Sequence, residues 1–326
     1  MKTLFLCCDT DDHLASVLFD GLQDLLGEES VYDASSCPSL HLGSGDNPNS
    51  RIGGSRVGHK LTETGTDGNM STPRVGGTRE GRRLGDEGDF DLMVINACYQ
   101  RDHADDWPFT LCERMRPGAK YAWVEGWDSA HEWHTPTLHV DACFRREIDP
   151  ACKYPYHPHS LMFAAPRRWF AVNNDRPIDV FYAGNHSSNH HRWEVLSAMW
   201  QTKTKHRSIG ASRGLDFDRY FSNLQQSKLA ICPAGAADGD ALRTWEAVAA
   251  GAIPIFVGYP VRTREPWFGP GMVCNCPTAA DLPNMLDCIL GEPEMIQPMR
   301  ERLQAHALAK HTTLARVRQM LNVLGI

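Results

Sequence analysis

Short apolar runs alternate with amphipathic stretches through the second half of the chain. The runs IDVFYAG (residues 178–184), KLAICPAG (228–235) and AIPIFVG (252–258) have the length and composition of buried strands. Between them, NHHRWEVLSAMW (189–200) and LRTWEAVAAG (242–251) have helical character. Strands that alternate with helices form a parallel sheet. The pattern therefore predicts a Rossmann-like α/β domain that binds ligands at the carboxyl ends of its strands.

The beginning of the chain has the same pattern. TLFLCC (3–8) and SVYDAS (30–35) read as strands, and HLASVLFDGLQDLLG (13–27) between them carries leucines at helical spacing. The runs at 89–99 and 119–129 add two more strands. A chain of 326 residues suits two domains. We therefore predict an α/β protein with two Rossmann-like domains that face a cleft. The expected ranges are an N-terminal domain at 1–165, a C-terminal domain at 175–300 and a C-terminal amphipathic helix at 301–326.

The segment 43–88 interrupts the first domain. It holds twelve glycines, no aromatic residue and seven basic against six acidic residues. Such a composition buries too little apolar surface to offset the entropy of ordering. We expect a long flexible insertion. An alternative interpretation is a flap whose arginines grip a substrate.

The net charge and the cysteine pattern indicate which partners and which cell compartment to expect. The net charge is −7 with a pI near 6.1, so nucleic-acid binding would need a local basic patch. Eleven cysteines are scattered without a CxxC pair, which is typical of a reducing compartment. The apolar start is too short for a signal-peptide core, and no run is long enough to span a membrane. We expect a cytoplasmic protein with no stable membrane insertion.

The segment CPAGAADGDALRTWEAVAAGAIPIFVG (232–258) is the strongest candidate for a binding site. Pro233 and Gly235 belong to a small-residue loop that lets a ligand approach the backbone. Arg243 and Glu246 are three residues apart, so they project from one face of the helix. An arginine suits a diphosphate, and a glutamate suits the hydroxyls of a ribose. The alternative is that these two side chains pair with each other at the surface.

Two further turns have the same character. GNHSSNHHRW offers Gly184 for a tight turn, Asn185 and Ser187 near the helix start, and Arg192 in the first helical turn. SIGAS contributes Gly210 and Ser212 in a weaker third turn. Each could equally be a strand-to-helix turn that binds nothing.

The segment from Ser227 to Gly258 resembles the nucleotide-sugar-binding half of exostosin-type glycosyltransferases of the GT-B fold. The resemblance rests on an Arg-x-x-Glu pair followed by Ala-Gly-x-Ile-Pro, at Arg243, Glu246, Ala250, Gly251, Ile253 and Pro254. DACFRRE, YPYHPHS and IDVFYAGNHSSNHHRW extend it over about 140–290. It implies that Glu246 binds the ribose and Arg243 the diphosphate of a donor, with no cofactor. One departure is the loop CPAGAADGD, which is smaller and more acidic than usual and leaves the sugar open.

A transfer that inverts the anomeric centre needs a base in the first domain, within hydrogen-bond reach of the acceptor hydroxyl. Glu125 and Asp128 in WVEGWDS, and His13 after the first strand, are the candidates in that order. Trp123 and Trp127 are expected to surround the acid with apolar surface and raise its pKa. Alternatively, Glu125 and Asp128 only cap a turn.

A metal site is not expected. The histidines of HEWH, His131 and His134, are one residue short of the spacing that places two imidazoles on one helix face. His190 and His191 are adjacent and cannot share a face. GT-B enzymes usually stabilise the departing diphosphate with helix dipoles and cations.

The leading hypothesis is a glycosyltransferase that moves a sugar from a nucleoside diphosphate to a hydroxyl, inverting and without a metal. The acceptor stays open between a glycan, a lipid-linked sugar, a protein and a hydroxylated nucleic-acid base. A nucleotide-sugar epimerase of the same fold is the first alternative. A non-catalytic nucleotide-sugar-binding protein is the second.

Overall fold

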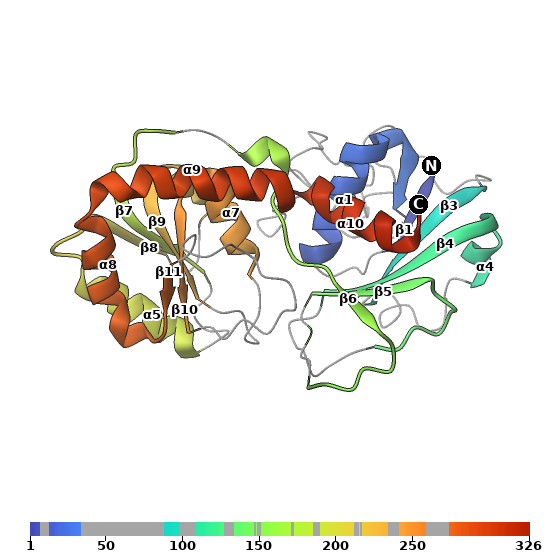
Figure 1. Cartoon of the computed structure of the whole chain (residues 1–326), viewed down its shortest axis with the longest axis horizontal. Coiled ribbons are helices and arrows are strands. Elements are labelled where there is room, and N and C mark those ends of the chain that lie inside the picture. Colours follow the sequence, from blue (N-terminus) through green and yellow to red (C-terminus); the bar gives the residue numbers. More distant parts are fainter. Residues whose placement is uncertain are drawn as a thin grey trace, which may run out of the picture.

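The chain folds into two parallel β-sheets that lie side by side (Figure 1). The computed structural model describes residues 1–6, 13–33, 88–97, 109–126, 134–146, 148, 151–170, 173–184, 190–211, 215, 217–233, 241–258 and 274–326. The predicted insertion at 43–88 lies outside these ranges except for Gly88.

The first sheet has the strand order β2-β1-β3-β4-β5-β6, and all its neighbours are parallel. Its strands are β1 (Thr3–Leu6), β2 (Val31–Asp33), β3 (Phe90–Asn96), β4 (Met115–Glu125), β5 (Ala142–Arg145) and β6 (Pro158–Ser160). Helix α1 (His13–Leu26) connects β1 to β2, followed by the 3₁₀ turn η1 (Glu28–Ser30), and α4 (Phe109–Cys112) precedes β4. The predicted apolar face of α1 is buried, since Leu14, Leu18 and Leu22 have no exposed surface.

The second sheet has the order β11-β10-β9-β7-β8 and is also parallel throughout. Its strands are β7 (Ile178–Ala183), β8 (Ser208–Ala211), β9 (Ser227–Pro233), β10 (Ile253–Val257) and β11 (Cys274–Cys276). The helices between them are α5 (His190–Gln201), α6 (Phe217–Gln225) and α7 (Leu242–Ala250), and η5 (Ala279–Asp281) and α8 (Leu282–Leu290) follow β11. Alternate residues of a strand face opposite sides of a sheet. Tyr182 accordingly packs in a cluster with Leu196 of α5, and Phe181 in the cluster of Trp245 of α7.

Two helices complete the chain, α9 (Pro293–Lys310) and α10 (Thr313–Leu324). The prediction of a single helix over 301–326 is wrong. Thr312 is extended, with φ −89° and ψ 160°, and its hydroxyl accepts a hydrogen bond from the Ala315 amide at 3.1 Å. This is the geometry of a helix N-cap, so a new helix begins there. The apolar spacing continues across the break and hides it in the sequence.

α9 and α10 belong to different domains. α9 packs against α7, α8 and β10, whereas α10 packs against α1 and β5 (Figure 1). The 3₁₀ helix η3 (Arg167–Trp169) lies in the connection from β6 to β7 and contacts α7. The chain therefore passes between the domains twice, once through η3 and once between α9 and α10.

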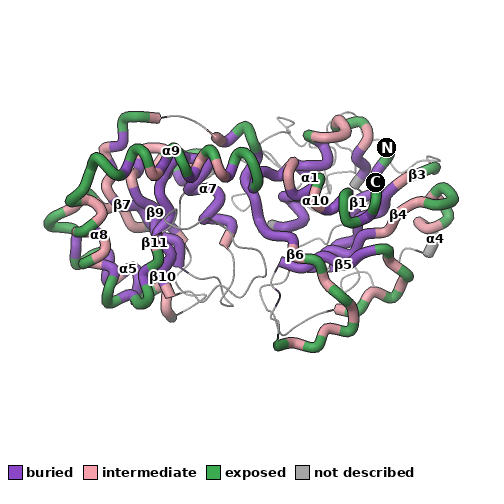
Figure 2. The backbone as a smooth tube through the Cα atoms, in the orientation of Figure 1, coloured by how far each residue is buried: buried purple, intermediate pink, exposed green. Residues whose placement is uncertain are grey.

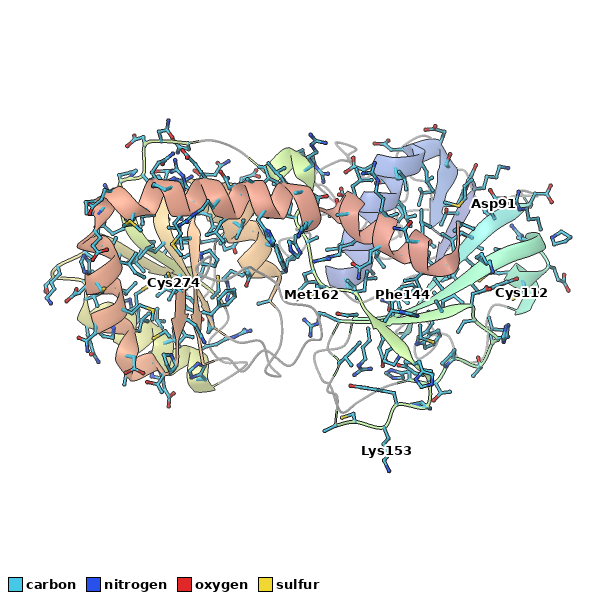
Figure 3. All side chains as sticks on the ribbon, viewed as in Figure 1. Asp91, Cys112, Phe144, Lys153, Met162 and Cys274 are labelled. Carbon is cyan, nitrogen blue, oxygen red and sulfur yellow. The ribbon has the colours of Figure 1, made fainter. Side chains whose placement is uncertain are left out.

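One apolar cluster extends through both domains. It includes Phe5 and Phe144 of the first sheet, Phe181 of the second and Trp245 of α7. Figure 2 shows buried backbone in both sheets and in the segment between them. In Figure 3, Phe144 lies in the first sheet, Cys274 in the second and Met162 between them. No helix among the described residues is long and apolar enough to cross a membrane.

Candidate functional site

α7 carries Arg243 and Glu246 into the protein interior. Every residue of this helix is buried, and Arg243 and Glu246 are 7% and 0% exposed. The helix ends at Gly251, whose φ of 82° is a left-handed cap, and the Arg176 guanidinium donates to the Ala250 carbonyl at 2.9 Å. No ion pair joins Arg243 to Glu246 in the described part of the chain. The alternative of a surface pair is therefore wrong.

The Arg243 guanidinium lies at the carboxyl end of β7. It is so close to Gly184 that a methyl group there would overlap it, and its carbon is 5.5 Å from the centre of the Tyr182 ring. No described residue accepts a hydrogen bond from it or forms an ion pair with it. Burial disfavours its charge, but Tyr220, Tyr182, Cys232 and Glu246 outweigh burial and raise the pKa of Arg243. Its buried Nε has no hydrogen-bond partner among the described residues, so this position suits an anionic ligand that accepts hydrogen bonds from the guanidinium.

Tyr182 connects Arg243 to the second expected arginine. Its hydroxyl is buried and has no hydrogen-bond partner among the described residues. Burial raises the pKa of Tyr182, and the nearby charges of Arg243 and Arg192 partly offset that effect. The arginines of two separate helices, α7 and α5, therefore act on the same hydroxyl. Gly184 and Arg243 lie together at this edge of the sheet, and Arg192 is near enough for its charge to act on the Tyr182 hydroxyl.

Glu246 is fixed by a tyrosine of the neighbouring helix. The Tyr220 hydroxyl donates to Glu246 Oε2 at 2.7 Å, and Glu246 has no exposed surface. Tyr220 comes from α6, which packs against α7. This bond holds the carboxylate in one orientation, one turn along the helix from Arg243.

The other predicted donor residues divide into three groups. Pro233 ends β9 and is paired with Val257 of β10. Gly210 lies inside β8, where a side chain would overlap Met199 and Leu196 of α5, so this glycine permits helix packing. Asn185, Ser187, Ser212 and Gly235 lie outside the described residues.

Three residues near this edge were not predicted as binding residues. Tyr182 and Tyr220 were read only as apolar parts of a strand and a helix. His191, considered only as a metal ligand, lies against Gly258, and its Nε2 is 3.3 Å from the Val257 carbonyl. The sequence feature that could have indicated His191 is Gly258, which directly follows β10 and has a φ of 75°. A side chain at this position would overlap the His191 ring. The described residues contain no group of three metal-ligating side chains.

In the first domain, Glu125 ends β4 and is fully engaged. Its carboxylate pairs with Arg145 and accepts hydrogen bonds from the Tyr156 hydroxyl at 2.6 Å and the His134 amide at 2.8 Å. The His134 imidazole Nδ1 lies 3.3 Å away. Glu125 thus connects β4 to β5 and to the segments around 134 and 156.

The two other candidate bases are not placed. Asp128 lies outside the described residues. His13 begins α1, and only its backbone is described. The structure therefore does not test whether either side chain reaches the acceptor hydroxyl.

Comparison with known proteins places the fold. No protein-family profile matches the chain, and no curated protein matches its sequence. A structure of HepE from Anabaena in complex with UDP matches with a TM-score of 0.54 at 10% identity, covering 100% of both chains. Sucrose-phosphate synthase from Thermosynechococcus elongatus matches with a TM-score of 0.50 at 11% identity, covering 72% of this chain and 73% of that one.

TarM from S. aureus is longer. The match covers 72% of this chain and 55% of TarM, at 10% identity and a TM-score of 0.46, so the chain spans about half of that protein. The likeness to HepE over full length confirms the predicted fold class. The protein is an α/β protein with two Rossmann-like domains of the GT-B type.

Proposed function

We propose that the protein is a glycosyltransferase that moves a sugar from a nucleoside diphosphate to a hydroxyl acceptor. The observation that carries this proposal is Arg243, a buried arginine that forms no hydrogen bond or ion pair with a described residue, at the carboxyl edge of a Rossmann-like sheet. This edge is where such folds bind nucleotides. Arg243 and Arg192 hold the diphosphate, and Glu246, oriented by Tyr220, accepts hydrogen bonds from the ribose.

The finer assignments follow from the resemblance of the donor segment to exostosin-type enzymes. The reaction inverts the anomeric centre and uses no metal, because cations and helix starts stabilise the departing diphosphate. The protein acts in the cytoplasm. HepE was determined with UDP, and UDP is therefore the first nucleotide to test.

The base comes from the first domain. The ion pair with Arg145 makes Glu125 a positioning residue that holds the carboxyl end of β4. Asp128 and His13 stay as candidates for the group that takes the acceptor proton. Replacing either should lower turnover by about 10²–10⁴-fold while nucleotide affinity stays unchanged.

Nucleotide binding is the first test. Isothermal titration calorimetry with UDP, GDP and CMP measures the Kd for the native protein, for Arg243→Gln and for the matched control Arg302→Gln, an exposed arginine of α9. We expect one nucleotide to bind and Arg243→Gln to weaken it at least about tenfold, the effect of a charge-assisted contact to phosphate. Equal affinity in Arg243→Gln and Arg302→Gln would overturn the donor site.

Activity is the second test. The sugar conjugate of the bound nucleotide is incubated with glycan, lipid-linked sugar, protein and hydroxylated DNA in the presence of EDTA. Transfer with an inverted anomeric proton coupling in the NMR spectrum supports the proposal. Conversion of the donor to its epimer without acceptor would show an epimerase. Binding with neither product would show a non-catalytic protein.

A further inference from the structure

Apart from the candidate donor site, the structure has a cavity where α9 meets α10. Its volume is about 530 Å³, which is enough for a small ligand. Arg167 of η3, Lys310 at the end of α9, and Arg316 and Arg318 of α10 line it. None of the residues that line it belongs to the candidate donor site.

The lining is strongly basic. The four cations are accompanied by no acidic residue among the described residues around the cavity. Residues 302–326 contain no aspartate or glutamate, although the whole chain has a net charge of −7. The exposed side chains of Arg167, Lys310 and Arg318 form no ion pair with any described residue. The cavity is therefore a local positive region on an acidic protein.

Arg316 forms the inner wall of the cavity and is held rigidly. It is 2% exposed, and its guanidinium donates to His311 Nδ1 at 2.6 Å and to Gln319 Oε1 at 3.1 Å. Both acceptors are uncharged, since burial and the charge of Arg316 keep the pKa of His311 at about 2. The start of α10 also faces this space through Thr312 and Ala315 and adds the positive end of a helix dipole.

We propose that this cavity binds a phosphate group, carried either by a soluble metabolite or by a lipid headgroup. Arginine and lysine side chains around a helix start are the groups that bind phosphate in proteins. Leu308, Leu314 and Val323 line the same cavity, so the ligand has an apolar part beside its phosphate. Such a ligand contacts α9, α10 and η3 together, and it therefore touches both domains and the connection between them.

Phosphate binding to the full-length protein tests the proposal. Inorganic phosphate is titrated at constant ionic strength, with chloride as the comparison ion, and thermal stability reports binding. The Arg243→Gln background removes the donor site as a source of signal. In this background Arg318→Gln should weaken phosphate binding about tenfold, the effect of one charge-assisted hydrogen bond. The matched control is Arg302→Gln, which replaces an exposed arginine of α9 that does not line the cavity. This variant should leave phosphate binding unchanged.

The source of the phosphate is distinguished with vesicles. If the native protein sediments with phosphatidylcholine vesicles that contain phosphatidic acid, and Arg318→Gln does not, the phosphate belongs to a lipid. If phosphate binds but vesicles do not, it belongs to a soluble molecule. The proposal is overturned if phosphate stabilises no more than chloride, or if Arg302→Gln and Arg318→Gln behave alike. UDP affinity of Arg318→Gln reports on the donor site separately, so either proposal can fail alone.

Discussion

Gly184 is small because Arg243 occupies the space beside it. In Gly184→Ala, the added methyl group would displace the guanidinium from the end of β7. We expect the Kd for the nucleotide to rise about tenfold, because the phosphate contact is lost. Stability should change little, since the displaced atoms are the end of a flexible side chain. Calorimetry and urea denaturation measure the two effects.

Gly88→Ala is the matched control for this substitution. A methyl group there has only the Arg114 carbonyl within reach, at 3.8 Å, so neither property should change. If Gly184→Ala bound nucleotide as the native protein does, Arg243 would not be the phosphate contact.

Glu125 offers a second test at the scale of one residue. Glu125→Gln removes the carboxylate that pairs with the buried Arg145, and breaking such a pair costs about 3–5 kcal/mol of the free energy of unfolding. Asp141→Asn removes a partly exposed pair with Lys120 and should cost less than about 1 kcal/mol. Urea denaturation compares the two. A Glu125→Gln protein of native stability but without turnover would instead mark Glu125 as the base.

At the scale of elements, the break between α9 and α10 depends on Thr312. Thr312→Ala removes the hydroxyl that caps the Ala315 amide, and we expect a loss of about 1 kcal/mol in the free energy of unfolding. Thr312→Ser keeps a hydroxyl in the same position and should restore most of it. If the serine variant were as unstable as the alanine variant, the threonine methyl group rather than the cap would hold this junction.

Most of the strands and helices could be predicted from the sequence, because their apolar spacing is regular. α1 and β10 are examples in which local pattern and burial agree. The junction at Thr312 could not, since the apolar spacing of Leu303, Ala307 and Val317 continues through it. Its cap is a single hydroxyl in a run of two threonines.

The candidate site was predictable in part for a different reason. Gly184 directly follows β7, and Arg192 and Arg243 lie in the first turns of α5 and α7, where the local composition favours phosphate binding. Tyr182 and Tyr220 look like ordinary core aromatics in the sequence. The sequence does not show which groups their hydroxyls lie beside in the folded chain. For Glu125, the sequence predicted a catalytic role and did not show its ion pair. Its position after a strand is typical of a catalytic acid, but Arg145, 20 residues away, pairs with it only in the folded chain.

At the scale of the whole molecule, His311 makes stability depend on pH. It stacks on Trp245 of the second domain at 4.6 Å, and burial, Arg316, His306 and Lys310 lower its pKa to about 2. Once unfolded, it takes up a proton near pH 6.5. Between pH 6.5 and 2 the unfolded state therefore binds more protons, and acidification destabilises the fold by up to about 1.4 kcal/mol per pH unit from this group.

His311→Gln should remove this contribution while keeping an acceptor for Arg316. The slope of the free energy of unfolding between pH 6 and pH 4.5 would then become shallower. His157→Gln, which replaces an exposed histidine, is the matched control. An unchanged slope in His311→Gln would mean that His311 becomes protonated in the folded protein.

The position of α10 also governs the order in which the protein can be made. α1 leaves the ribosome before α10, yet the two helices pack against each other, with Gly21 in close contact with the Thr313 backbone. At roughly 5–20 residues per second, translation reaches α10 only tens of seconds after α1. During that interval the apolar surface of α1 that α10 will cover stays exposed. The domain that contains α1 is thus completed only when α10 has been made, and until then a nascent chain keeps this apolar surface open to other contacts.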